Sequence, residues 1–139
     1  MSRVDEETLI KASITYGADA PSEVVDRIGE ARTYAIMASA MSLAVDNAFP
    51  KDVASETIQQ FAASLKTRFP DGAGEIKPMV VEAMIRAIRG EGQLLEGIDH
   101  KDVLNMLFLI TYAIMSHENL HGDQLDAYVG AVIKLADAS

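Results

Sequence analysis

The chain has 139 residues, of which 49% are apolar and 24% charged, a composition typical of a single globular domain. Its formal net charge of −9 is unfavourable for binding duplex DNA or an anionic membrane, because those surfaces require a basic face. We therefore expect neither a nucleic acid nor a membrane as a partner. The absence of cysteine excludes disulfide bonds, thiolate nucleophiles and cysteine-ligated metal sites.

The sequence shows no targeting signal. Its first seven residues are polar and acidic, and they lack the apolar core that a signal peptide needs. The most apolar run, residues 103–115, would rise only about 20 Å as a helix, which is less than the roughly 30 Å of a bilayer core. We therefore expect a cytoplasmic protein in which this run forms a buried helix.

Helices are predicted along the whole chain, because no stretch alternates apolar and polar residues as a half-buried strand would. Apolar spacing and Gly/Pro breaks predict six helices over about 5–16, 21–47, 52–65, 76–89, 100–116 and 123–136. We expect Asp52, Asp99 and Asp123 to cap the third, fifth and sixth of these helices. Gly90 and Gly92 are expected to end the fourth.

Apolar side chains indicate which faces are buried. Five methionines at core-facing positions are expected to fill gaps in the interior: Met37, Met41, Met84, Met106 and Met115. In the fourth predicted helix, Val80 and Val81 lie on the apolar face. Glu82 and Arg86 are an i,i+4 pair on its solvent-facing side.

A displacement of 71 residues superimposes the second half of the chain on the first. Leu9 and Ile10 then fall on Val80 and Val81, and the apolar positions of the other helices also coincide. The loops 46–52 and 117–123 match as well, each with a large apolar residue three places after its start and an Asp at its end. A chance similarity between amphipathic helices of equal length is the alternative.

The repeat predicts the domain organisation. We expect one compact all-α domain over residues 1–139, a bundle of about six helices, with residues 103–115 at its centre. Its two similar three-helix halves, the pseudo-repeats, would span about 4–68 and 75–138 and share one core.

One segment, His117-Glu118-Asn119-Leu120-His121, has the H-E-x-x-H pattern of zinc hydrolases. On a continuous helix its two histidines would share a face and bind zinc, while the glutamate activates the metal-bound water. Gly122 follows at once and indicates that the helix ends inside the motif, and no third ligand stands out. The alternative is a loop with solvated histidines.

The two matched loops also carry carboxylates, the ligands that Mg²⁺ or Ca²⁺ prefers. They are Asp46, Asp52 and Glu56 in the first loop, and Glu118, Asp123 and Asp126 in the second. Helix capping is the simpler explanation of the aspartates, so we assign no catalytic, cofactor-binding or metal-binding residue. The candidate metal ligands that remain are His117, Glu118, His121, Asp46, Asp52 and Asp123.

The repeated arrangement resembles the helix–loop–helix of TerB-like tellurite-resistance domains. In each copy, Asp46-Asn47 or His117-Glu118 is followed by a large apolar residue, an acid and a new amphipathic helix. Val53 and Gln124 occupy the positions at which that family carries a glutamate. The resemblance implies a compact all-α fold and a non-catalytic stress-response module, with metal binding as one option.

The sequence contains no glycine-rich phosphate loop and no serine-centred nucleophile elbow. We therefore expect a non-enzymatic interaction or regulatory module, which needs no cofactor and acts through a protein partner or through self-association. The zinc hydrolase is one alternative. A pocket for a small apolar ligand between the second and fifth predicted helices, 21–47 and 100–116, is another.

Overall fold

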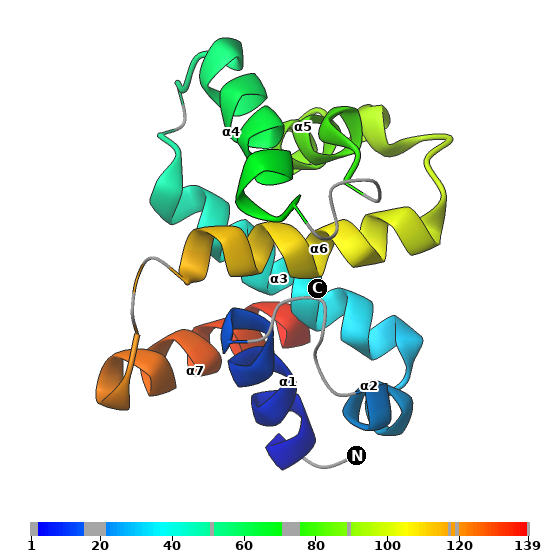
Figure 1. Cartoon of the computed structure of the whole chain (residues 1–139). Helices are drawn as coiled ribbons and strands as arrows, with labels where there is room; N and C mark the ends of the chain where they lie inside the picture. Colours follow the sequence, from blue (N-terminus) through cyan, green and yellow to red (C-terminus); the bar gives the residue numbers. More distant parts are fainter. Residues whose placement is uncertain are drawn as a thin grey trace. The chain divides into compact units, whose positions relative to one another are not determined.

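The computed structural model describes residues 3–15, 22–50, 52–70, 76–88, 90–116, 118 and 120–138. Within these ranges every regular element is helical, which confirms the all-α fold class (Figure 1). The elements are α1 (Arg3–Thr15), α2 (Ser22–Ile28), α3 (Glu30–Ala48), α4 (Ser55–Arg68), α5 (Pro78–Ile88), the 3-10 helix η3 (Gly92–Leu95), α6 (His100–Met115) and α7 (Gly122–Ala138). None of the helices described here combines the length and the apolarity needed to cross a bilayer.

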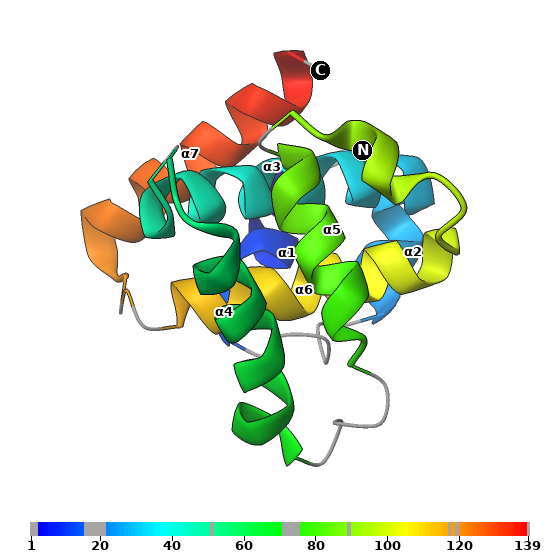
Figure 2. The ribbon, with the colours of Figure 1, turned by 90° about the horizontal axis from the view of Figure 1, so that it is seen from above.

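The chain divides into two compact units. Unit 1 comprises Met1–Ala44 and Leu107–Ser139, and unit 2 comprises Val45–Met106, so that α3 and α6 each contribute residues to both. Within unit 1, α1 packs against α2 and α7, whereas within unit 2, α5 packs against η3 and against α4, which lies beside it in Figure 2. This division differs from the predicted three-helix halves, and the repeat remains a prediction.

The predicted helix over 21–47 is wrong as a single element, because Gly29 separates α2 from α3. Gly29 has φ +94°, a left-handed conformation that favours glycine. Its N–H donates to the Val25 carbonyl at 2.9 Å, and its own carbonyl accepts from the Thr33 N–H at 3.0 Å. Hydrogen bonding therefore continues on both sides of Gly29, while the left-handed residue interrupts the helical path.

The cap predicted at Asp52 is wrong as well. Helix α4 begins three residues later, its N-cap is Ala54, and no side chain caps it. Asp52 is exposed in the preceding turn, in which the Val53 N–H donates to the Pro50 carbonyl at 3.0 Å. This backbone turn delays the start of the helix beyond the reach of the Asp52 carboxylate.

Asp123 does not occupy a cap position either. Helix α7 begins at Gly122, so Asp123 lies inside its first turn, where a carboxylate is still favoured by the positive end of the helix dipole. Asp99, in contrast, directly precedes α6 as predicted. Its carbonyl accepts a hydrogen bond from the Val103 N–H at 3.1 Å.

The predicted apolar faces form the interior of each unit. All five methionines expected in the core are buried, and residues 103–115 form a largely buried helix as predicted. The largest fully buried apolar side chains are Leu9, Ile10, Ile36, Met37, Met41, Ile110 and Val132 in unit 1, and Val45, Leu65, Val81 and Ile85 in unit 2. In unit 2, the rings of Phe49 and Phe61 meet edge to face at 5.4 Å, which holds α4 against the end of α3.

Candidate functional site

A pocket of about 430 Å³ lies in unit 2 between α5 and the segment that contains η3. Its lining is Met79, Val80, Glu82, Ala83 and Arg86 from α5, with Leu94 and Ile98 from the segment that follows. The α5 residues recur at intervals of three and four, so they form one continuous face of the helix. The pocket is partly open to solvent, and its volume exceeds the roughly 30 Å³ share of one water molecule more than tenfold.

Gly90 brings the η3 segment back against α5. It has φ +110°, and its N–H donates to the Ala87 carbonyl at 3.1 Å, while the Glu91 N–H donates to the Arg86 carbonyl at 3.1 Å. These two bonds form a Schellman motif, the turn that satisfies the last carbonyls of a helix and reverses the chain. The glycines were predicted to end this helix, and Gly90 also starts the return of the chain that forms the second wall of the pocket.

The same turn places the side chain of Glu91 against Arg86. The Arg86 Nε and Nη2 atoms donate to the two Glu91 carboxylate oxygens, each at 2.9 Å. This bidentate pairing raises the pKa of Arg86 and lowers the pKa of Glu91, with hydrogen bonding as the main cause in both. Both side chains therefore remain charged at neutral pH and fasten one end of the η3 segment to α5.

A second ion pair fastens the other end of the segment. Lys77, just before α5, donates from Nζ to Oδ2 of Asp102 in the first turn of α6 at 2.7 Å. Hydrogen bonding to Asp102 raises the pKa of Lys77. Along the chain, Lys77 and Asp102 bracket the pocket-lining residues, and Arg86 and Glu91 lie between them. The two ion pairs therefore help to hold the walls of the pocket in place.

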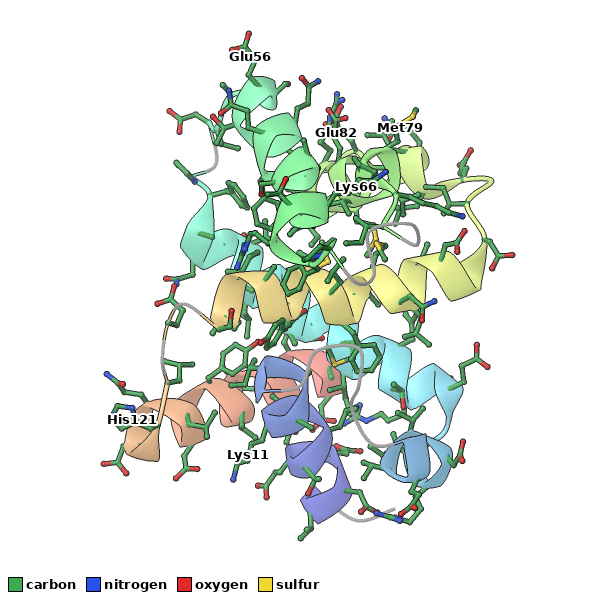
Figure 3. The ribbon with its side chains drawn as sticks, in the orientation of Figure 1. Lys11, Glu56, Lys66, Met79, Glu82 and His121 are labelled. Atoms are coloured by element: carbon green, nitrogen blue, oxygen red, sulfur yellow. The ribbon has the colours of Figure 1, made fainter. Side chains whose placement is uncertain are left out.

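Among the described residues that line the pocket, the acidic one is Glu82. Its Oε1 accepts a hydrogen bond from Gln59 Nε2 of α4 at 3.1 Å and lies 3.7 Å from Arg86 Nη1. The predicted i,i+4 pair of Glu82 and Arg86 is therefore confirmed. Met79 lies at the edge of the same face with 84% of its surface exposed, and Figure 3 shows Met79 and Glu82 on the same outward side of α5.

The described residues of the H-E-x-x-H motif lie outside the helices. Helix α6 ends at Met115, before the motif, and α7 begins after it, so Glu118 and His121 lie between two helices. We expected a helix to end inside the motif, whereas α6 ends at Met115, two residues before the first position of the motif. Both described side chains are exposed, and Figure 3 shows His121 beside the start of α7. The other histidine of the motif, His117, lies outside the described residues.

The predicted acidic ligands are spread over several elements. In unit 2, Asp46 is exposed in the last turn of α3, Asp52 lies in a turn, and Glu56 is exposed in the first turn of α4. In unit 1, Asp126 of α7 lies 4.0 Å from Lys11 of α1. Among the residues that the structure describes, no three His, Cys, Asp or Glu side chains are grouped as a metal site would require.

Comparison of the chain with protein-family models, with curated proteins and with solved structures gives no match. Function is therefore argued from the site alone. Sequence reasoning missed the α5 pocket, although Met79, Val80, Ala83 and Leu94 are all apolar. The pocket predicted between helices 21–47 and 100–116 is not the α5 pocket, and it stays a prediction.

Proposed function

We propose that this chain is a non-enzymatic interaction module of the cytoplasm, which binds an apolar segment of a partner protein in the α5 pocket. The pocket beside the exposed Met79 carries this proposal. Methionine is unbranched and polarizable, so it adapts to partners of different shape, and apolar side chains inserted into such pockets provide most of the binding energy of an interface.

The polar groups of the wall support binding rather than catalysis. Among the described lining residues only Glu82 and Arg86 are ionisable, and each is held by a neighbour, Gln59 or Glu91. A general base or nucleophile must instead reach the reacting atom of a substrate. Side chains that are already paired at the edge of an apolar pocket are suited to orienting a partner.

The proposal is tested by filling the pocket. Ala83→Leu adds apolar volume to the lining, whereas Ala63→Leu makes the same change on the exposed surface of α4. The ligand is a synthetic helical peptide with leucines at i, i+3 and i+4 spacing and glutamine elsewhere. Binding is measured by fluorescence anisotropy and localised by the NMR signal of the Met79 methyl group.

We expect the peptide to shift the Met79 signal, and Ala83→Leu to weaken its binding about tenfold, while Ala63→Leu leaves the affinity unchanged. Equal affinities for both variants would contradict the proposal. Light scattering of the free protein distinguishes a second copy of the chain as the occupant, because a dimer that dissociates on Met79→Asp would assign the pocket to self-association.

A further inference from the structure

We propose that the partner segment carries a lysine or arginine beside its apolar side chains, and that this cation binds Glu82. The inference rests on the proposed function and names the chemistry of the partner. It follows from the way in which the carboxylates around the pocket are partnered.

One carboxylate oxygen of Glu82 has no hydrogen-bond partner among the described residues. The hydrogen bond from Gln59 and the approach to Arg86 both use Oε1, and Oε2 has no partner within the described residues. The side chain is only 21% exposed, so it has lost much of its hydration. A cation from a partner would therefore interact with Glu82 more strongly than with a fully solvated carboxylate.

Arg86 is shared between the carboxylates of Glu82 and Glu91. Two bonds of 2.9 Å join Arg86 to Glu91, whereas the nearest separation between Arg86 and Glu82 is 3.7 Å. Because two carboxylates share one guanidinium, Glu82, Arg86 and Glu91 together carry one net negative charge. A negative potential therefore remains at the pocket wall.

The surroundings of the pocket add to this potential. Glu96 lies between the lining residues Leu94 and Ile98 in the sequence, is exposed, and forms no ion pair with any other described residue. Among the described residues, Glu82 lines the pocket, Glu91 and Glu96 belong to the segment that follows α5, and the whole chain has a formal charge of −9. This charge favours a basic partner and opposes a second copy of the same acidic chain.

Three synthetic peptides test the inference. They share the leucine pattern described above and differ only at the polar positions, which are all lysine, all glutamine or all glutamate. Each is titrated into the full chain, into Glu82→Gln and into Glu56→Gln. Glu56 is the matched control, because it is an exposed acid in the first turn of α4, and its substitution changes the net charge equally (Figure 3).

We expect the lysine peptide to bind about fivefold more tightly than the glutamine peptide, the upper range for one partly solvated ion pair. Glu82→Gln should abolish this preference of the chain for the lysine peptide over the glutamine peptide, whereas Glu56→Gln should preserve it. Circular dichroism of both variants confirms that they fold. The Met79 methyl signal should shift with each peptide that binds.

The possible failures are distinct. If the lysine and glutamine peptides bind equally at Met79, the basic partner is wrong and the proposed docking function stands. If both glutamate substitutions weaken the lysine peptide equally, the attraction is diffuse and Glu82 has no special part in it. If no peptide shifts the Met79 signal, the docking function itself is wrong.

Discussion

The guanidinium of Arg32 holds both carboxylate oxygens of Glu6 within unit 1. Arg32 Nε donates to Oε2 and Nη2 to Oε1, each at 3.0 Å, and Nη2 also donates to Oδ1 of Asp137 at 2.6 Å. Glu6 is only 5% exposed, so the Arg32 guanidinium replaces part of the hydration that its carboxylate loses on burial. One arginine of α3 thus ties together α1 and the end of α7.

Arg32→Ala should therefore be strongly destabilising. The substitution removes two hydrogen bonds of 3.0 Å and a positive charge from the buried Glu6 carboxylate, and we expect the free energy of unfolding to fall by about 3 kcal/mol in urea denaturation. Arg27→Ala is the control, because the Arg27 side chain is 54% exposed and pairs with Asp5 at the surface. Its cost should stay below about 1 kcal/mol. Equal losses in the two variants would show that the Glu6 pair has no special importance.

Two glycines should respond to alanine in opposite directions. Gly29 has φ +94°, and a Cβ added there would meet only open space. Gly29→Ala therefore introduces backbone strain without a steric clash, and should lower the free energy of unfolding by about 1–2 kcal/mol. Gly130 lies inside α7 without a left-handed φ, and an alanine Cβ there would meet only open space, so Gly130→Ala should stabilise by about 0.5–1 kcal/mol. Thermal unfolding measures both. Changes of the same sign would argue against the left-handed break between α2 and α3.

Tyr128 should make the protein sensitive to alkali. Its O–H donates to the Ala40 carbonyl at 3.2 Å, and burial raises the pKa of its phenol above the ordinary value of 10.0. The folded state therefore favours the neutral phenol. This contribution to stability is complete below pH 10 and is lost as the pH rises through the raised pKa.

In an alkaline titration followed by phenolate absorbance, we expect one late step that coincides with the loss of helical circular dichroism. Tyr128→Phe should remove the late step, since phenylalanine cannot ionise. A variant that retains this step would assign it to another tyrosine.

The position of Glu118 and His121 outside the helices predicts weak zinc binding. Glu118 and His121 lie between α6, which ends at Met115, and α7, which begins at Gly122, so His121 is not held on a helix as a zinc ligand of such a motif would be. After dialysis against trace zinc, we expect substoichiometric metal in elemental analysis, and no change in His121→Ala. One equivalent of zinc that disappears in both His121→Ala and His117→Ala would instead support the hydrolase.

The helical class and much of each buried face could be predicted because both depend on local spacing. Leu9, Ile10, Val81 and Ile85 recur at helical intervals and are buried as expected. The break at Gly29 was missed because an isolated glycine is tolerated within a helix, and its φ is not visible in the sequence. The start of α4 was misplaced because Asp52 is a good cap residue, yet the backbone turn at Val53 takes precedence.

For the candidate site, the sequence identified the Glu82–Arg86 pair but not the pocket beside it. Val80 and Val81 both belong to the apolar face of α5, but Val81 is fully buried while Val80 lines the pocket. Apolarity is a property of each residue, whereas exposure depends on which neighbours the fold supplies.

The amino-acid order alone determined that this protein is helical and that it lacks the cysteines and basic surface needed for several classes of function. Those conclusions follow from the composition and from apolar residues that recur at intervals of three and four positions. Only the tertiary structure decided that the chain returns after Gly90, so that Leu94 and Ile98 face α5 and leave a pocket beside Met79. The physical reason is that Gly90, in a left-handed conformation, reverses the chain, and the Arg86–Glu91 ion pair holds the two sides of this turn together. The helical spacing of apolar residues, which can be recognised in the sequence, ends at this turn.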